Sequence, residues 1–405
     1  MKKKVSIILL ALIFVFTSFV PAFAQVLTNE EQIASFLVAN AKTGEIYYSK
    51  NEDQVFGVAS MSKLMTYLII KDELAKGLYK ESDIVEITEE SARLSVPGNS
   101  RMDLEVGEML TVKDLLDGLI VVSGNDASVA LAIKSAGSDK AFAEKMNQRA
   151  KELGLNDSTF VNASGLTEYV EKDGEEVQEY NKMSANDLFK LSMEIINTYP
   201  EISEYSKMEQ LIMPERNFVG DHTHTLFKSI PSLRGLKSGF TDEAGYNFTG
   251  YVDMDAQIPG QKYKLVTIVI GADTVGSRRD ATQELITYVS DRYDYKDAVG
   301  YEKQIPVTDF VSNHTKTKTF PLYAEKPLDG LYPKGSTPSL SYVLDEDAKA
   351  PFEDGQVLGE LTVKVGDKEV GKVNLINKGY KPRLSFINMV YESLKDFVKS
   401  LMLLF

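Results

Sequence analysis

Strand-like segments lie at both ends of a helix-rich stretch in the first 300 residues, and this order most strongly constrains the fold. Residues 35–51 contain two strand-like stretches on either side of Lys42-Thr43-Gly44, which predicts a β-hairpin. Strand patterns return at residues 246–252 and 262–270, and a helical pattern follows over about 280–293. Between these ends, helical patterns cover residues 59–74, 112–135, 139–153 and 184–196. The order predicts one domain in which helices cover a mixed sheet.

The chain changes character after residue 300, where prolines accumulate. Seven of the 13 prolines lie in residues 301–405, which disfavours long helices there. In this part, apolar and polar residues alternate on both sides of Gly366-Asp367, a pattern typical of a hairpin with a two-residue turn. We therefore predict a separate small β domain over residues 299–381.

The first 24 residues have the pattern of a signal peptide. Three lysines at positions 2–4 precede an almost wholly apolar run over residues 5–20, and Ala22-Phe23-Ala24 provides an A-x-A cleavage signal before Gln25. An uncleaved transmembrane anchor is the alternative, and the shortness of the apolar run argues against it. The sequence therefore predicts an exported protein.

The absence of cysteine and the net charge exclude several kinds of site and partner. A chain with no Cys has no disulfide, Cys–zinc site, iron–sulfur cluster or thiol nucleophile, so its stability must come from its core. The formal net charge is −14, and residues 1–24 carry three Lys and no acid, so the remainder carries −17. Such an acidic body repels phosphate backbones, which argues against nucleic acid as a partner.

The C-terminal residues 382–405 predict an amphipathic helix. Its apolar stripe recurs at three- and four-residue steps and contains Ile387, Val390, Leu394, Phe397, Leu401 and Leu404. Charges in mid-segment make a bilayer span costly, at about 2.5–3.5 kcal/mol for each charge near the centre. From Lys378 onward five Lys or Arg stand against two acids, which suits an anionic lipid surface. We therefore expect this helix to lie on the outer face of the cytoplasmic membrane, rather than to dock on the protein's own core.

The chain contains one S-x-x-K motif, Ser60-Met61-Ser62-Lys63, at the start of an apolar helical run. Ser60 and Lys63 should therefore share a face at a helix N-terminus. A Ser hydroxyl becomes nucleophilic when an adjacent base takes its proton, and a neutral lysine can be that base. Burial and a second nearby cation would both favour the neutral amine. The structural alternative is that Ser60 only caps the helix and that Lys63 is a solvated charge in its first turn.

Two further motifs each occur twice. Ser123-Gly124-Asn125 lies between two helical runs, whereas Ser184-Ala185-Asn186 begins a helix, so we assign Ser123 to chemistry and Ser184 to capping. The triplet K-[ST]-G occurs as Lys42-Thr43-Gly44 and as Lys237-Ser238-Gly239. The earlier triplet supplies the turn of the first hairpin, so we assign the later one to the site.

The order S-x-x-K, S-x-N, K-[ST]-G is that of the penicillin-recognising serine enzymes. Stretches such as VASMSKLMT, IVVSGNDAS and LRGLKSGFTDEAGYNF resemble the low-molecular-mass D-alanyl-D-alanine carboxypeptidases, and the resemblance extends over about residues 30–380. It implies an α+β fold, with an antiparallel sheet flanked by helices as in β-lactamases and transpeptidases, and a small all-β C-terminal domain. It also implies a catalytic domain over residues 25–298, between the signal peptide (1–24) and the β domain (299–381).

The resemblance implies catalytic roles for three residues and a substrate. Ser60 would attack the carbonyl between two D-alanines of a peptidoglycan stem peptide, and Lys63 would be the general base. Ser123 would relay the proton to the leaving D-alanine amine. β-Lactam antibiotics would acylate Ser60 in the same way, and no cofactor or metal is implied.

It also implies a substrate-binding set of five residues. Asn125 would position the substrate amide, and Lys237 and Ser238 would hold the terminal carboxylate. Gly239 belongs to the same triplet. The backbone N–H of Phe240, together with that of the nucleophile, would stabilise the oxyanion.

The sequence departs from the family pattern at three places. Ser238 stands where Thr is usual, and this exchange keeps the hydroxyl, so we expect it to affect substrate preference rather than activity. His222 and His224 stand where the family tends to have Asn. Residues 162–165 read Asn-Ala-Ser-Gly in place of a more usual Pro-His-Gly ending.

Single sequence features argue against other functions. A class A β-lactamase needs a glutamate that activates water, and Glu144 and Asn147 form an E-x-x-N pattern that we interpret as a helix face. An inactive wall-binding scaffold would have a broken motif, and all three are intact. H-E-x-x-H and G-x-S-x-G do not occur, which argues against a metalloprotease and a Ser-His-Asp hydrolase. His222 and His224 lack a nearby third ligand, so we expect ordinary surface residues.

Overall fold

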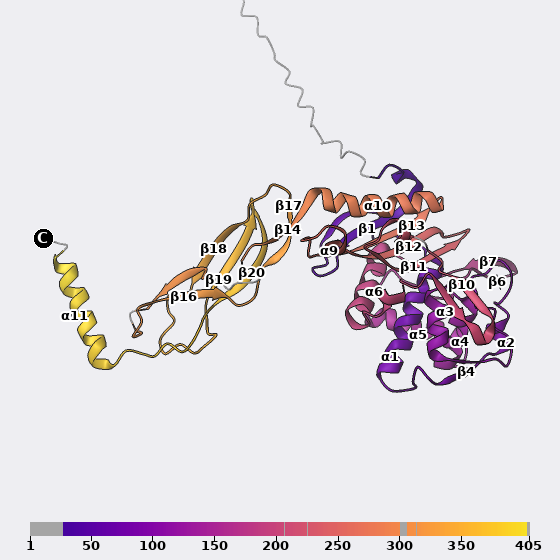
Figure 1. The fold of residues 1–405 in the computed structure, drawn as a ribbon, viewed down its shortest axis with the longest axis horizontal. Helices are drawn as coiled ribbons and strands as arrows, with labels where there is room; N and C mark the ends of the chain where they lie inside the picture. The colour runs from indigo at the N-terminus through magenta and orange to yellow at the C-terminus, as the bar shows by residue number, and fades with distance from the viewer. Residues whose placement is uncertain (1–26, 206, 225, 300–305, 313, 403–405) are drawn as a thin grey trace, which may run out of the picture.

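The chain forms a helix-covered sheet, a smaller β domain and a separate C-terminal helix (Figure 1). The computed structural model describes residues 27–205, 207–224, 226–299, 306–312 and 314–402. The predicted signal peptide and its cleavage site lie outside the described residues.

The larger sheet joins the first two strands of the chain to three strands that follow residue 230. Its strand order is β11-β12-β13-β1-β2 and all its pairings are antiparallel, as the resemblance implied, rather than mixed. The strands are β1 (Ile33–Asn40), β2 (Ile46–Lys50), β11 (Leu233–Thr241), β12 (Gly245–Asp253) and β13 (Lys264–Ala272). In β1, Leu37 packs into one core, and Phe36 and Val38 pack into another on the opposite face. Because both faces of the sheet are covered, the sequence of β1 is a nearly continuous apolar run.

Helices cover both faces of this sheet (Figure 1). One face carries α10 (Val275–Arg292), which contributes Leu285 and Ile286 to the core with Phe36. The other face carries α1 (Lys63–Ala75), α3 (Val112–Ile120), α4 (Asn125–Ala136), α5 (Asp139–Glu152) and α6 (Ala185–Thr198). The predicted helix-covered sheet is confirmed.

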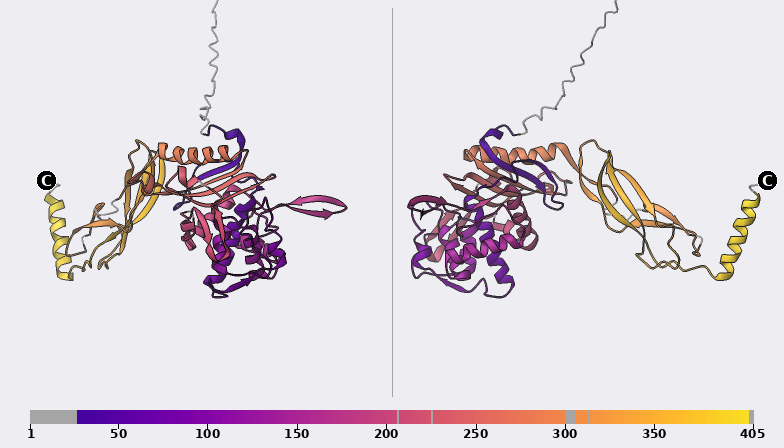
Figure 2. Two further views of the ribbon diagram at one scale, coloured as in Figure 1. Left: turned by 45° about the vertical axis from the view of Figure 1, so that its right-hand side comes forward. Right: turned by 180° about the vertical axis from the view of Figure 1, so that it is seen from behind.

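Short elements connect these layers. The short helices are α2 (Glu89–Ala92), α7 (Ile202–Tyr205), α8 (Leu226–Ser229) and α9 (Met254–Gln257). The short strands pair as β3 (Phe56–Gly57) with β8 (Lys182–Met183), β4 (Ile84–Glu86) with β5 (Met109–Thr111), and β9 (Gln210–Met213) with β10 (Phe218–Asp221). The hairpin of β6 (Glu168–Lys172) and β7 (Glu175–Glu179) projects from the body (Figure 2).

Local side-chain chemistry sets several of these boundaries. The long helical pattern over 112–135 is divided between Ile120 and Asn125, and Ser123, with φ +61°, lies in the connection. Ser184 caps α6 by accepting a hydrogen bond from the Asp187 N–H over 3.1 Å, which confirms its predicted capping role. Gly44 has φ +75° in the turn of the first hairpin, as expected for Lys42-Thr43-Gly44.

The smaller domain is a five-stranded antiparallel sheet, which confirms the predicted β domain. Its strands are β15 (Thr308–Val311), β16 (Thr319–Ala324), β20 (Lys368–Asn377), β19 (Val357–Val365) and β18 (Ser339–Leu344), in spatial order. Phe310, Phe320 and Phe352 form its core, and Gly366-Asp367 is the predicted turn between β19 and β20. The two domains meet where β14 (Tyr293–Asp297), directly after α10, pairs with β17 (Asp329–Pro333).

Helix α11 (Phe386–Met402) ends the described chain and lies apart from both sheets in every view (Figures 1 and 2). Its apolar residues Ile387, Val390 and Leu394 are 78 %, 45 % and 60 % exposed, so this stripe is not docked on the protein's own core. Among the described residues, no helix combines the length and the apolar character needed to cross a membrane.

Candidate active site

Ser60 lies in a 3-10 turn at the start of the first long helix. This turn, η2 (Ala59–Ser62), leads into α1, whose N-cap position is occupied by Ser62. Ala59 has φ +47°, and the buried Ser62 hydroxyl donates a hydrogen bond to the Ala59 carbonyl oxygen over 2.5 Å. Ser60 therefore does not cap α1, and its hydroxyl is free for another role.

Lys63 is fully buried and its amine contacts Ser60. Its Nζ lies 2.9 Å from Ser60 Oγ, 2.7 Å from Asn125 Oδ1 and 2.6 Å from the Ser164 carbonyl oxygen. A neutral amine has two N–H donors and one lone pair. The amide and carbonyl oxygens take the two donors, which leaves the lone pair for the Ser60 hydroxyl. The geometry therefore allows Lys63 to accept the Ser60 proton.

The surroundings of Lys63 favour this neutral form. Burial is the main cause and the Lys237 cation the second, and together they hold the pKa of Lys63 well below its usual value. The carboxylates of Asp126 and Asp139 act in the opposite direction and are outweighed. The solvated first-turn lysine of the structural alternative is therefore not what the fold produces.

The carbonyl that binds Lys63 belongs to a loop at residues 162–165. Asp139 Oδ1 accepts a hydrogen bond from the Ala163 N–H over 2.8 Å, and the Thr66 hydroxyl donates to the Ala163 carbonyl oxygen over 2.9 Å. Burial raises the pKa of Asp139 to about 6. The Asn-Ala-Ser-Gly sequence of this loop therefore does not prevent the contact with Lys63, because a backbone carbonyl oxygen makes that contact.

The connection between α3 and α4 carries the second motif. Ser123 and Asn125 are each 2 % exposed, and both line the same cleft as Ser60. The Asn125 N–H donates to the Ser100 carbonyl oxygen over 2.9 Å, which fixes the start of α4. Because Asn125 Oδ1 is engaged by Lys63, the amide NH2 is the end that can meet a substrate carbonyl.

Strand β11 is an edge strand and brings the third motif against the turn of Ser60. A Cβ on Gly239 would lie 2.9 Å from the Ser60 nitrogen and 2.9 Å from the Val58 carbonyl oxygen, so only glycine allows this approach. Phe240, the next residue, is 48 % exposed and stacks on Tyr246 with ring centroids 4.2 Å apart.

The side chain of Lys237, a residue of β11, is buried in a cationic environment. Its Nζ donates to the Ser238 carbonyl oxygen over 3.0 Å. Burial, and then the Arg278 cation, lower the pKa of Lys237 to about 7. Ser238 is 5 % exposed and its hydroxyl faces the cleft.

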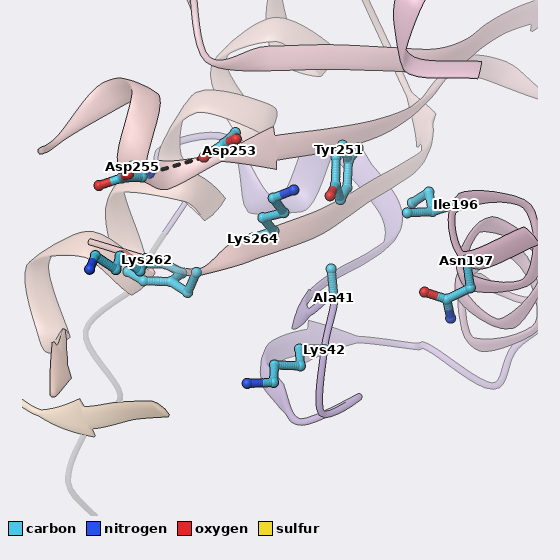
Figure 3. A pocket seen from close by; sticks show the side chains of 10 residues that line it. Ala41, Lys42, Ile196, Asn197, Tyr251, Asp253, Asp255, Lys262 and Lys264 are labelled. Carbon is cyan, nitrogen blue, oxygen red and sulfur yellow. Dashed lines mark hydrogen bonds between the residues drawn. The ribbon is translucent and has the colours of Figure 1, made fainter. Parts of the chain in front are cut away.

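A cleft of about 420 Å³ collects most of the predicted residues. It is lined by Ser60, Ser123, Asn125, Ser238, Gly239 and Phe240, and Lys63 and Lys237 lie buried beside it. A larger cavity of about 520 Å³ lies at the C-terminal ends of β1 and β12, where Lys42, Tyr251 and Lys264 line it (Figure 3). Because Lys42 lies there, Lys42-Thr43-Gly44 belongs to the hairpin turn and not to the cleft.

Arg278, which was not predicted from the sequence, also lines the cleft. It lies in the first turn of α10, is 7 % exposed, and has no described hydrogen-bond partner for its Nε. Burial lowers the pKa of Arg278. A cation in the first turn of a helix opposes the helix dipole. This unfavourable position is the sequence feature that could have indicated a role for Arg278.

His222 and His224 are buried, which corrects the expectation of surface residues. They are 7 % and 1 % exposed, and their rings pack edge to face with centroids 4.4 Å apart. Burial lowers the pKa of His222 to about 4 and holds the pKa of His224 well below its usual value, so both imidazoles are neutral at pH 7. Among the described residues, no group of three His, Cys, Asp or Glu could hold a metal ion.

The E-x-x-N pattern of the β-lactamase alternative serves the fold. Asn147 donates to the Phe160 carbonyl oxygen over 2.7 Å and accepts from the Phe160 N–H over 2.9 Å, which supports the loop that precedes residues 162–165. Glu144 is exposed on α5, and neither residue lines the cleft.

Comparison with known proteins gives consistent matches. A sequence model described as D-alanyl-D-alanine carboxypeptidase, Peptidase_S11, matches residues 24–274, and one described as Penicillin-binding protein 5, C-terminal domain, matches residues 301–380. The D-alanyl-D-alanine carboxypeptidase DacF of Bacillus subtilis is 30 % identical over 371 residues, which cover 90 % of each chain.

Solved structures share the architecture. A peptidoglycan synthesis regulatory factor (PBP3) from Streptococcus pneumoniae has a TM-score of 0.70 and 26 % identity, and the match covers 86 % of this chain and 99 % of that one. Penicillin-binding protein D2 from Listeria monocytogenes, solved in a cefotaxime-bound form, has a TM-score of 0.54 and 30 % identity over 64 % of this chain and 96 % of that one.

Proposed function

This chain belongs to the D-alanyl-D-alanine carboxypeptidase family, and we propose that Ser60 is the nucleophile with which it removes the terminal D-alanine from peptidoglycan stem peptides. It is a serine-type carboxypeptidase of the penicillin-binding kind. The observation that carries the proposal is the 2.9 Å contact between Ser60 Oγ and the buried amine of Lys63.

Acylation uses the two residues of this contact together with Ser123. Lys63 takes the Ser60 proton while Oγ attacks the carbonyl carbon of the penultimate D-alanine. The peptide C–N bond then breaks, and Ser123 relays the proton to the departing D-alanine amine. Water attacks the resulting ester with Lys63 again as base, which releases the shortened peptide and regenerates the Ser60 hydroxyl.

The oxyanion is stabilised by the backbone N–H groups of Ser60 and Phe240. Gly239 permits the close approach of β11 to the Ser60 nitrogen, which supports this assignment. Donors of this kind contribute about 2.7–4 kcal/mol each to lowering the barrier. The free edge of β11 supports an extended peptide as an added strand, with its amide held by Asn125.

The terminal carboxylate is held at the cationic end of the cleft. Lys237 supplies a buried charge and Ser238 a hydroxyl donor. Arg278 adds a second cation that lines the same cleft. An anionic carboxylate provides the counter-charge for this cluster, which explains the preference for a free C-terminus.

Covalent labelling with a fluorescent penicillin tests the nucleophile. We expect wild type to label and Ser60→Ala to remain unlabelled, because the ester cannot form without Oγ. A Ser60→Ala protein that still labels would end the assignment. D-alanine release from a pentapeptide, with and without an amine acceptor, measures the reaction itself. A β-lactamase would turn penicillin over rapidly instead of keeping a long-lived adduct.

The duplicated motifs provide matched controls. Ser123→Ala should slow D-alanine release, whereas Ser184→Ala removes only a helix cap and should leave release unchanged. Likewise, Lys237→Ala should raise KM, whereas Lys42→Ala alters a residue outside the cleft.

We further propose how the enzyme is placed in the cell. The leader at 1–24 directs export, residues 25–298 form the catalytic domain and residues 299–381 the β domain. Helix 382–405 then holds the enzyme on the outer face of the cytoplasmic membrane. The exposed stripe of α11 and the excess of basic residues from Lys378 onward support this placement.

A further inference from the structure

Residues 222–224 follow β10 and bend at Thr223, and their side chains alternate between core and cleft. His222 and His224 are buried, whereas Thr223 between them is exposed and lines the cleft. The His224 ring occupies the space beside Gly235, where a Cβ would lie 1.8 Å from Nε2. It also packs on Phe248 with ring centroids 5.1 Å apart. The two imidazoles thus anchor the segment and direct the Thr223 side chain into the cleft.

Thr223 bonds to both walls of the cleft. Its N–H donates to the Val121 carbonyl oxygen over 3.0 Å, two residues before Ser123 on one wall. Its Oγ1 lies 3.2 Å from Ser238 Oγ on the other wall. The segment therefore connects the loop of the proton relay to the strand of the carboxylate site.

Ser238 needs such a partner more than a threonine would. A β-branched threonine has few χ1 rotamers, because its methyl group restricts rotation. Serine lacks this methyl, so the direction of its hydroxyl depends on what it bonds to. The Thr223 hydroxyl is the described partner of Ser238 Oγ in the cleft.

We propose that Thr223 is a positioning residue that orients the Ser238 hydroxyl toward the substrate carboxylate. This inference rests on the proposed role of Ser238 in binding that carboxylate. In the free enzyme the Ser238 hydroxyl donates to Thr223 Oγ1. When the carboxylate binds, this bond reverses, so that Thr223 Oγ1–H donates to Ser238 Oγ and Ser238 Oγ–H donates to the carboxylate oxygen. Each bond polarises the next, so the pair holds the anion more strongly than a freely rotating serine does.

The test measures kcat and KM for D-alanine release in the full-length enzyme. Thr223→Val keeps the shape and the backbone N–H but loses the hydroxyl. We expect KM to rise about five- to tenfold, the loss of one hydrogen bond, with kcat within about twofold. Thr223→Ser keeps the hydroxyl and should stay within about twofold of wild type in both constants. An unchanged KM in Thr223→Val, or an equal rise in Thr223→Ser, would overturn the inference.

The same substitution in a Ser238→Thr enzyme distinguishes orientation of the residue 238 hydroxyl from a purely structural effect of Thr223. In Ser238→Thr the added methyl restricts the hydroxyl by itself, so adding Thr223→Val there should raise KM by less than about twofold. An equal rise in both backgrounds would contradict the proposal. Wild type that releases no D-alanine would instead refute the proposed function, so the two failures are distinguishable.

Discussion

Two lysines are buried beside one cleft, and their described hydrogen-bond partners are neutral oxygens. Lys63 contacts a hydroxyl, an amide oxygen and a carbonyl oxygen, and Lys237 contacts the Ser238 carbonyl oxygen. Burial of a charge without a bonded counter-charge is costly, so both amines have lowered pKa values. The same physical cause supports both proposed roles, a neutral base at Lys63 and, at Lys237, a cation that would gain a counter-charge when substrate binds.

The titration of Lys237 predicts the alkaline limb of the pH profile. Lys237 is cationic below its pKa of about 7 and neutral above it. As pH rises, the free enzyme therefore progressively loses the positive charge that is proposed to bind the substrate carboxylate. We expect kcat/KM for D-alanine release to fall above about pH 7, by up to about tenfold per pH unit. At saturating substrate the bound carboxylate raises the pKa of Lys237, so kcat should stay nearly level. About pH 9 lies about two pH units above the pKa of Lys237, so a kcat/KM that stays flat to that pH would contradict this role.

At the scale of elements, glycines allow two segments, β11 and the loop of Ser164, to approach the turn that contains Ser60. Gly239 brings β11 against η2, and Gly165 brings the loop of Ser164 against the same turn. Gly165 has φ +84°, and a Cβ there would lie 2.0 Å from the Ala59 carbonyl oxygen. Side chains at these two positions would push apart the groups that surround Ser60, the proposed nucleophile.

Gly165→Ala tests this close approach, and Gly174→Ala is its control. Gly174 in the β6–β7 hairpin has φ +83° but open space around it, so both variants suffer the left-handed strain of about 1–2 kcal/mol. Only Gly165→Ala also displaces the Ala59 and Ser164 backbone. We expect its acylation by penicillin to slow about 100-fold and that of Gly174→Ala to stay within about twofold. Thermal unfolding checks the shared strain, and equal acylation rates would refute the idea.

At the scale of the whole molecule, charge and apolar surface are segregated along the chain. The body is acidic, with a formal net charge of −14 for the full sequence, while the residues from Lys378 onward are basic. The apolar stripe of α11 is exposed and lies at the end of the molecule farthest from the catalytic sheet (Figure 1). This separation supports the proposed membrane contact through α11.

Vesicle co-sedimentation tests the membrane contact. Leu394→Asp removes one apolar contact of about 1.5–3 kcal/mol, so binding to vesicles with anionic lipid should fall at least about tenfold. Val343→Asp, on the exposed strand β18, makes the same kind of change elsewhere and should bind like wild type. Both variants should retain D-alanine release from a soluble peptide. Equal binding by the two variants would exclude α11 as the anchor, and binding should weaken with salt.

Much of the fold could be predicted because its determinants are local. The Ser184 cap, the turn at Gly44 and the hairpin at Gly366-Asp367 depend on residues within a few positions, so the amino-acid pattern was enough to place them. The S-x-x-K spacing likewise puts Ser60 and Lys63 on one helix face, which is a property of helix geometry.

The chemistry of the site depended on contacts between distant parts of the chain. The partners of Lys63 at Asn125 and Ser164 are 62 and 101 residues away, and these contacts bury the amine and direct its lone pair. The burial of His222 and the approach of Arg278 to the cleft are likewise tertiary. The sequence alone thus determined which reactive groups are present and their local geometry. The tertiary structure decided which of them lose water, and desolvation is what sets their pKa values and makes them reactive.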